Sequence, residues 1–419
     1  MLKLWQPLTQ HAMAPPALVI ARAEGAYLFT AGGRRIFDGI SSWWVTTHSH
    51  SHPAIRAAIA RQAEKLSQTI FANFTHEVAA DFISEMSRVA DPTFTRVFLS
   101  DSGSTANEVA LKMAIGAWHH RGQPQRHKIV TFDDSYHGAT LGATSLGARG
   151  VFSRAHEALL FEVLRVPSPA VDAAGCLEAL EKTFAAHQND IAAVIIEPLI
   201  QGAGGMKFYG AEVLDEITRI AHAHHAFMIF DEVMTGFGRS GTLFAYQQCQ
   251  ELPDIITLAK GITGGFLPMG ATLARAEIFD AFYVRDKSKM LFHSTSYTGN
   301  ALALAAAAAN LRVWREEKTA EKLKSINSYH QKFLPHLNVK NPRICGTIAA
   351  FEIEAADNNY LATIGQNLQE FALARDMLLR PLGNTVYIMP PYCTTAKDLE
   401  HCYDVIREFL EQQHALRAA

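Results

Sequence analysis

The sequence has few cysteines and none of the close pairs that bind zinc or carry redox chemistry. The five cysteines lie far apart, at Cys176, Cys249, Cys345, Cys393 and Cys402. Because no two of them have CxxC spacing, neither a disulfide framework nor a cysteine zinc site is indicated. This usage is typical of a protein from a reducing compartment.

Long apolar runs and an excess of charge of one sign are also missing. The N-terminal segment MLKLWQPLTQHAMAPP lacks the apolar core of a signal peptide, and no stretch reaches the roughly 20 apolar residues of a membrane-spanning helix. The formal net charge is -3 with 19% charged residues. Nothing in this balance indicates binding to nucleic acid or an anionic membrane, so we expect a cytoplasmic protein.

Internal repeats, low-complexity tracts and long linkers are absent as well. A chain of 419 residues exceeds the roughly 250 to 300 residues at which a single core stops growing. We therefore expect a large domain over residues 51–310 and a small C-terminal domain over 311–419. We expect residues 1–50 to pack with the small domain, with a hairpin around Ala31, Gly32 and Gly33.

Short β-branched runs alternate with helical patterns between about residue 90 and residue 275, which predicts βαβ units and a mostly parallel sheet. The expected strands are 96–100, 127–132, 192–197, 226–231 and 254–259. Helical patterns at 107–120 and 212–226 lie between them. After residue 310 a long helix, the segment 344–354, a further helix and VYIMPPY suggest a smaller α+β domain.

The ligand crevice of such a sheet lies at the carboxyl ends of its strands. The first expected strand is followed by DSGST and then a helix, whose free amide groups could bind a phosphate through Gly103 and Ser104. Taken alone, the segment is better explained as an ordinary helix cap. Because the sequence has no GxxxxGK[ST], a P-loop is excluded.

Three further strands end in residues that can carry chemistry. Tyr136 and His137 follow the second strand, although either residue could serve packing alone. Asp231 ends an apolar strand, where a buried acid calls for a cationic partner. Lys260 directly follows another apolar strand and is followed by a glycine-rich loop. A lysine whose pKa is lowered by burial is the usual Schiff-base former.

Pyridoxal 5'-phosphate is a ligand that would give each of these residues a role. Lys260 would supply the amine and Asp231 would keep the pyridine nitrogen protonated. Gly103 and Ser104 would take the phosphate. Tyr136 and Val233 would contact the two ring faces, and we also expect Tyr136 to take part in catalysis and substrate binding. Asp231 and Lys260 are 29 residues apart by their numbering, enough for one crossover between neighbouring strands.

The sequence resembles the class III aminotransferases of fold-type I over nearly its whole length. The resemblance rests on DSGSTANEVALKMA, SYHGAT, IIEPLIQGAGGM, FDEVMTGFGRSG, LAKGITGG and HSTSYTGNALA. It implies a homodimer with shared active sites, in which Thr295 and Ser296 reach the phosphate of the partner subunit's cofactor. It also implies that Ser294 contacts substrate.

Within this class, GISSWWVTTHSHSHP and LLRPLGNTVYIMPPY are most similar to the branch that converts 8-amino-7-oxononanoate to 7,8-diaminononanoate in biotin synthesis. The resemblance implies that Trp43 and Trp44 line an apolar slot and that Arg380 meets the substrate carboxylate. Without the resemblance, core packing would explain the two tryptophans and a surface ion pair would explain Arg380. Leu8 and Ala139 stand where the family often has a tyrosine and an acid. The amino donor therefore stays open between S-adenosylmethionine and another amine such as lysine.

Several alternatives stay open at this point. Another class III aminotransferase, acting on an ω-amino acid, ornithine or a polyamine, is the main one, followed by an aminomutase and a non-catalytic binding protein of the same fold. Arg239 in GFGRSG is a weak substrate-contact candidate that could instead brace its loop. The histidine groups at 48–52 and 222–225 lack metal-site spacing, so no metal is expected.

Overall fold

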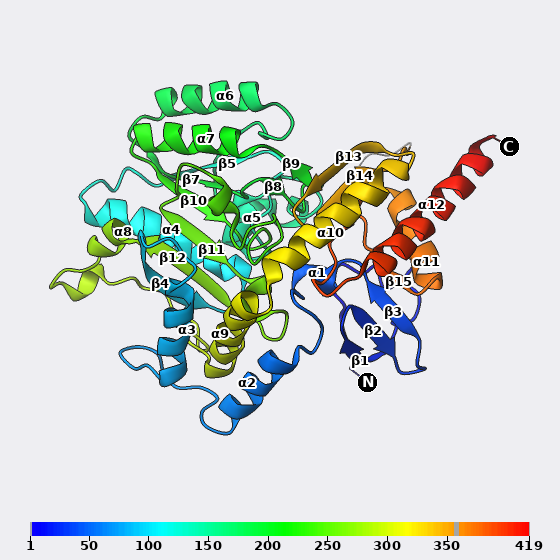
Figure 1. Ribbon diagram of the computed structural model, residues 1–419. Helices are drawn as coiled ribbons and strands as arrows, with labels where there is room; N and C mark the ends of the chain where they lie inside the picture. The colour runs from blue at the N-terminus through cyan, green and yellow to red at the C-terminus, as the bar shows by residue number, and fades with distance from the viewer. Residues whose placement is uncertain (1, 356–359, 419) are drawn as a thin grey trace.

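The computed structural model describes residues 2–355 and 360–418. It has a large body built on a seven-stranded sheet and a smaller body formed by both ends of the chain (Figure 1). Helix α10 (Thr319–Phe333) runs between them. In the described ranges, no helix is both long and apolar enough to cross a membrane.

The large sheet is mostly parallel, as predicted. Only β12 runs against its neighbours, since it pairs antiparallel with both β11 and β4. The strand order is β4 (Phe94–Ser100), β12 (Gly270–Arg275), β11 (Ile255–Leu258), β10 (Phe227–Asp231), β7 (Ile191–Ile196), β5 (Lys128–Phe132) and β6 (Leu164–Val166).

The five strands predicted from the sequence are all present, and the sheet has two more. The prediction missed β6, which has only three residues, and β12, whose sequence GATLAR is rich in small residues. Neither offers the β-branched run that identifies a strand. In β12, pairing with a neighbour on each side selects the extended conformation.

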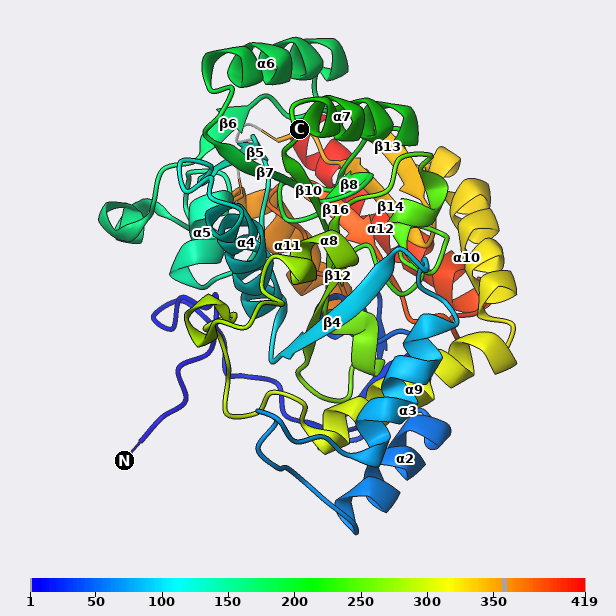
Figure 2. The same ribbon diagram turned by 90° about the vertical axis from the view of Figure 1, so that its left-hand side faces the viewer.

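Helices cover both faces of this sheet. On β10, Phe227 and Ile229 pack in the apolar cluster that contains α4 (Gly103–His120), whereas Met228 and Phe230 pack with α6 (Ala173–Ala186) and α7 (Ala211–Ala223). This alternation follows from the two-residue period of a strand. Helices α2 (Pro53–Ala63) and α3 (Glu77–Ser87) pack on α9 (Ala301–Glu316), and the three lie together in Figure 2.

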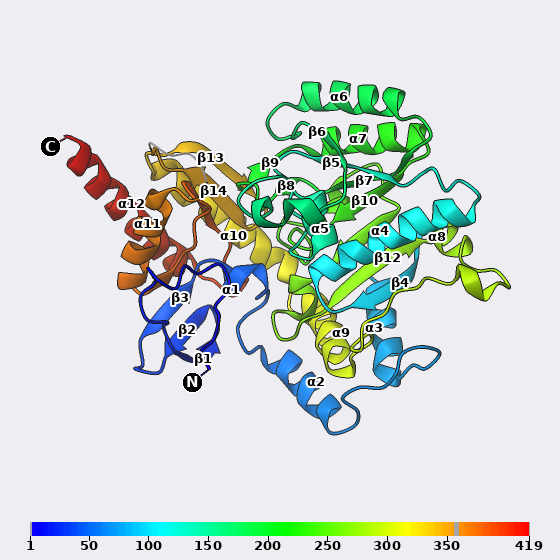
Figure 3. The ribbon, with the colours of Figure 1, turned by 180° about the vertical axis from the view of Figure 1, so that it is seen from behind.

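The smaller body combines the two ends of the chain. Strands β1 (Ile20–Glu24), β2 (Tyr27–Thr30) and β3 (Arg35–Asp38) form a sheet with β15 (Met377–Leu378), and Figure 3 shows them beside the C-terminal helices. The predicted hairpin is confirmed, with Gly33 in the left-handed region at a φ of 85°. The rest of this body comprises β13 (Lys340–Cys345), β14 (Ile348–Glu352), β16 (Thr385–Ile388), α11 (Thr363–Ala374) and α12 (Ala396–Ala418).

Short elements complete the described chain. They are α1 (Ser41–Trp44), α5 (Leu141–Leu146), α8 (Ala276–Asp280), the hairpin of β8 (Ile200–Gln201) with β9 (Lys207–Phe208), and the 3-10 helices η1 (Arg154–Leu159), η2 (Ala245–Gln248), η3 (Lys260–Thr263), η4 (Lys287–Lys289) and η5 (Leu334–His336).

Candidate active site

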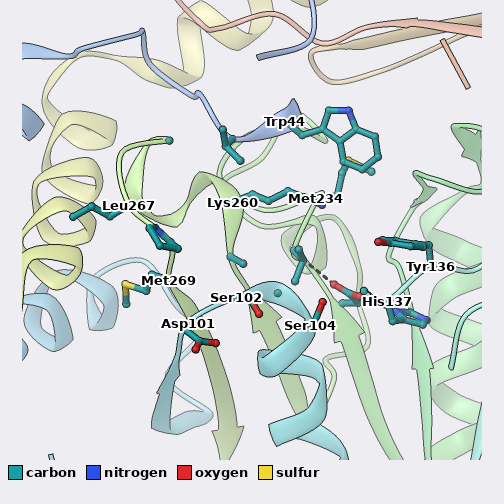
Figure 4. A pocket seen from close by; sticks show the side chains of 18 of the residues that line it. Trp44, Asp101, Ser102, Ser104, Tyr136, His137, Met234, Lys260, Leu267 and Met269 are labelled. Carbon is teal, nitrogen blue, oxygen red and sulfur yellow. Dashed lines mark hydrogen bonds and ion pairs between the residues drawn. The ribbon is translucent and has the colours of Figure 1, made fainter. Parts of the chain in front are cut away.

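Residues at the carboxyl ends of five strands line one cavity of about 460 Å³. In Figure 4 the side chain of Lys260 extends into this cavity below Trp44, and Ser102 and Ser104 lie at the start of α4 on the other side. Of the residues predicted from the sequence, the structure brings together Trp44, Gly103, Ser104, Tyr136, Asp231, Val233 and Lys260.

Lys260 begins η3, with one residue between it and the end of β11, and has a φ of 44°. Burial lowers the pKa of its amine to about 8, and the carboxylates of Asp231 and Glu197 oppose the shift. The Nζ atom lies 4.6 Å from the ring centroid of Trp44, a contact that favours the charged amine. The lysine is therefore close to the balance between its charged and neutral forms near physiological pH.

Asp231 is buried at the end of β10, and both of its oxygens have partners. Oδ2 accepts a hydrogen bond from Asn107 Nδ2 at 2.8 Å and lies 2.7 Å from His137 Nδ1. Oδ1 accepts the Val233 amide hydrogen at 3.0 Å. These contacts fix the carboxylate in one orientation at the cavity wall.

Asn107 belongs to this network and was missed by the sequence analysis. The residue is fully buried on α4, and its Nδ2 donates to the His137 carbonyl as well as to Asp231. Its Oδ1 accepts a hydrogen bond from Thr257 Oγ1 at 2.7 Å. An amide on a helix face that is otherwise apolar was the available signal, because a buried amide requires partners.

The start of α4 is shaped to admit a ligand. Ser102 and Thr105 form a capping box, and Ser102, Gly103 and Ser104 line the cavity. A Cβ on Gly103 would lie 2.6 Å from Val233 Cγ1, and one on Gly138 would lie 2.2 Å from Ser104 Oγ. Only glycine fits at either position.

Glu197 is a second residue that the sequence analysis missed. It follows β7, lines the cavity and is buried. Its Oε1 accepts the Tyr136 amide hydrogen at 3.0 Å, and its Oε2 accepts that of Gly202 at 2.9 Å. Burial raises the pKa of Glu197 to about 7. A carboxylate ending an apolar strand was the same signal that identified Asp231.

Trp43 and Trp44 lie on a turn of unusual backbone conformation. The four residues of α1 all have positive φ, at 52°, 45°, 71° and 74° from Ser41 to Trp44. Left-handed conformation costs non-glycine residues roughly 1–2 kcal/mol each. Trp44 is buried and donates from Nε1 to the Tyr387 hydroxyl at 2.9 Å, whereas Trp43 is partly exposed.

Arg380 meets this turn from the C-terminal part of the chain. Its guanidinium carbon lies 4.6 Å from the ring centroid of Trp43, and its Nη2 donates to the Leu8 carbonyl at 3.5 Å. It has no ion-pair partner among residues 2–355 and 360–418. Arg380 thus meets Trp43, whereas Trp44 lies against Lys260, and of these four residues only Trp44 and Lys260 line the cavity.

A second cavity of about 570 Å³ adjoins the first and shares Tyr136 and Gly138 with it. Tyr360 lines this space. Burial raises the pKa of Tyr360, and the charge of Arg380 works against the rise. The guanidinium charge is therefore close enough to act on a residue that lines the second cavity.

Arg239 braces the backbone. It is buried, and its Nη atoms donate to the carbonyls of Trp44, Thr46 and Pro390. Burial lowers its pKa. Because it does not line the cavity, the geometry favours the bracing role over a contact with substrate.

Ser294, Thr295 and Ser296 do not line the cavity of their own chain. Ser294 and Ser296 are exposed, and the Thr295 amide donates to Thr298 Oγ1 at 3.0 Å. Within one chain these residues contribute nothing to the site.

The histidine groups are paired with acids. His50 contacts Asp38, His52 contacts Glu317, His222 contacts Asp254 and His224 contacts Glu181. Burial lowers the pKa of His48 to about 3. In the described ranges no cluster of three side chains suited to a metal ion occurs.

Comparison with curated proteins identifies close relatives. A relative from Synechococcus elongatus named adenosylmethionine-8-amino-7-oxononanoate aminotransferase is 42% identical over 422 residues, covering 98% of each chain. The enzyme of the same name from Geobacter sulfurreducens is 34% identical, covering 96% of this chain and 94% of its own.

Solved structures agree with this relationship. The adenosylmethionine-8-amino-7-oxononanoate aminotransferase of Methanocaldococcus jannaschii matches with a TM-score of 0.92 and 30% identity, covering 98% of this chain and 97% of its own. An amine transaminase from an uncultivated Pseudomonas species, in its PLP-bound form, matches with a TM-score of 0.88 and 30% identity, covering 98% of each chain. The expected fold-type I architecture is confirmed.

The sequence also matches a family profile. The profile described as aminotransferase class-III covers residues 9–410, which include every residue described above as lining the cavity. The relatives just named match over nearly their full length. The chain therefore belongs to the class III aminotransferases.

Proposed function

We propose that the protein uses pyridoxal 5'-phosphate to convert 8-amino-7-oxononanoate to 7,8-diaminononanoate, with S-adenosylmethionine as the amino donor. The observation that carries the proposal is the α1 turn, which places Trp44 against Lys260 and Trp43 against Arg380, each at 4.6 Å. The names of the curated relatives support the same substrate. The reaction would be one step of biotin synthesis.

The cavity residues fit the cofactor. The α4 amides and Ser104 would hold its phosphate, and the glycines at 103 and 138 let Val233 and Ser104 pack closely at the cavity wall. Tyr136 and Val233 would contact the ring, and Asp231 would meet its nitrogen. When bound, pyridoxal phosphate withdraws electrons from the substrate carbon that carries the amine.

Lys260 would hold the cofactor and move the proton at that carbon. An amine with a pKa near 8 can both accept and release a proton at neutral pH. Asp231 would stabilise positive charge on the ring nitrogen, and its bonds to Asn107 and His137 keep it oriented for this. Glu197 holds the Tyr136 backbone beside the ring position.

The acceptor has a carboxylate at one end, a methylene chain and a carbonyl near the other end. Arg380 would bind the carboxylate, because the guanidinium has no acidic partner among the described side chains. Trp43 and Trp44 would lie along the methylene chain, and the carbonyl would lie near Lys260. Ser294 would contact substrate from the partner subunit.

The assembly we propose is a homodimer. Thr295 and Ser296 would reach the partner's phosphate site, since they lie away from the cavity of their own chain. We also propose the division into an N-terminal segment 1–50, a large domain 51–310 and a small domain 311–419. A cytoplasmic location fits the relatives' place in small-molecule biosynthesis.

The test is a half-reaction screen. Pyridoxal-form enzyme is mixed with S-adenosylmethionine, lysine, ornithine or a short ω-amino acid, and conversion to the pyridoxamine form is followed by absorbance. The pyridoxamine form is then mixed with 8-amino-7-oxononanoate. Rapid return to the pyridoxal form supports the proposal. If 8-amino-7-oxononanoate does not restore the pyridoxal form, and the enzyme instead reacts with ornithine or an ω-amino acid, the protein is a class III aminotransferase with a different substrate.

A further inference from the structure

A buried carboxylate holds the middle of the left-handed turn. Asp38, the last residue of β3, is fully buried, and its Oδ2 accepts a hydrogen bond from Ser42 Oγ at 2.8 Å. The same oxygen lies 2.8 Å from His50 Nε2, and Oδ1 accepts the Ile40 amide hydrogen at 3.3 Å. Asp38 does not line the cofactor cavity.

The other anchors hold the ends of the turn. Ser41 Oγ donates to the Met389 carbonyl at 2.7 Å, and the Trp44 indole donates to Tyr387 at 2.9 Å. Arg239 holds the Trp44 carbonyl. Among the described residues, the Ser42 side chain hydrogen-bonds to Asp38.

The helical form of this turn matters for the two indole rings. In a strand, neighbouring side chains point to opposite faces, whereas in a helical turn of either hand they diverge by roughly 100°. Left-handed backbone at Ser42, Trp43 and Trp44 sends the rings to two cations, Arg380 and Lys260. Serine and tryptophan do not favour this conformation, so it must be held by contacts.

We propose that Asp38 is a positioning residue that sets acceptor recognition by fixing Ser42 and, through it, both tryptophan rings. The inference rests on the proposed function for the identity of the acceptor. Asp38 touches neither cofactor nor substrate; it determines whether Trp43 lies against Arg380 while Trp44 lies against Lys260. Loosening the turn therefore weakens acceptor binding and leaves the donor half-reaction nearly intact.

The test compares Asp38→Asn and Ser42→Ala, which remove the same contact from its two sides. Each is expected to raise the KM for 8-amino-7-oxononanoate about tenfold, with the donor half-reaction within about twofold of wild type. Adding Ser42→Gly to Asp38→Asn should recover part of the loss, because glycine adopts positive φ freely. Thermal unfolding of each variant shows whether it is folded.

The matched control is Glu317→Gln. Glu317 pairs with His52 at 3.0 Å. This pair has the same histidine–carboxylate chemistry as His50 and Asp38, but it does not contact the turn. It should leave the acceptor KM unchanged. The inference is overturned if the wild type uses the keto acid and both turn variants match it, or if acceptor and donor steps fall together. If the wild type rejects the keto acid, the proposed function fails, and the same variants are compared with the acceptor that the screen identifies.

Discussion

Asp231 and Thr257 are paired residues of the neighbouring parallel strands β10 and β11, and Lys260 follows Thr257 by three positions. This register brings an acid and an amine to the same edge of the sheet. Thr257 also donates to Asn107, which in turn holds Asp231, so the two strands are joined by side chains as well as by the backbone. The predicted adjacency of these strands is confirmed.

Lys260→Ala should abolish turnover while leaving binding of pyridoxal phosphate measurable, because the other cavity residues remain. Borohydride reduction of the wild type followed by peptide mapping should label Lys260. Lys207, which lines the adjoining cavity and pairs with Asp134 at 2.5 Å, is the internal control and should stay unlabelled. Label on Lys207 or any other lysine would show that Lys260 does not hold the cofactor.

The rate at which apoenzyme recombines with pyridoxal phosphate should rise with pH around a midpoint of about 8, the lowered pKa of Lys260. Only the neutral amine attacks an aldehyde, and its fraction grows as pH passes upward through this pKa. Since the Asp231 charge raises the pKa of Lys260, Asp231→Asn should move the midpoint downward. Stopped-flow absorbance at several pH values measures this. A midpoint near that of an exposed lysine would contradict the assignment.

Asp231→Asn should lower kcat by about 10²- to 10³-fold, as expected when a preorganised charge is removed. Asn107→Ala should lower kcat by less, about tenfold, because His137 still contacts the carboxylate. Asn327→Ala, which removes an amide that donates to the Gly346 carbonyl away from the cavity, is the control. Equal kcat for Asn107→Ala and the control would mean that Asn107 does not orient Asp231.

Arg380→Ala should raise the KM for 8-amino-7-oxononanoate by about one to two powers of ten, the value of a charge-assisted contact of roughly 1.5 to 3 kcal/mol. Arg380→Lys should recover only part of the binding, because an ammonium lacks the two-pronged geometry of guanidinium. The donor half-reaction should change less. Arg375→Ala, at an exposed pair with Glu408, is the control. A normal KM for Arg380→Ala would remove this residue from the substrate site.

Hybrid dimers test the shared active site. Lys260→Ala and Thr295→Ala subunits, each of low activity alone, should regain activity when unfolded and refolded together. With random pairing about half of the dimers are hybrids, each with one intact site, which gives about a quarter of wild-type activity. Activity no higher than the mean of the two parents would show that Thr295 serves no partner site.

The sequence alone determined the candidate residues that line the cavity and the edge of the sheet on which they lie. Lys260, Asp231 and Tyr136 each follow an apolar run that predicts a buried strand, and parallel strands bring their carboxyl ends together. The strand positions and the hairpin at Gly33 followed from equally local patterns. Local periodicity and turn chemistry are sufficient for such features.

Tertiary structure alone decided the contacts that orient these residues. Asn107 meets Asp231 across 124 positions of sequence, and Trp44 meets Tyr387 across 343, so no local pattern encodes either pair. β12 is a strand because it has partners on both sides. The left-handed turn at Ser42 opposes the preference of its own residues and persists because distant groups hold its ends, as the Met389 carbonyl holds Ser41 and the Tyr387 hydroxyl holds Trp44.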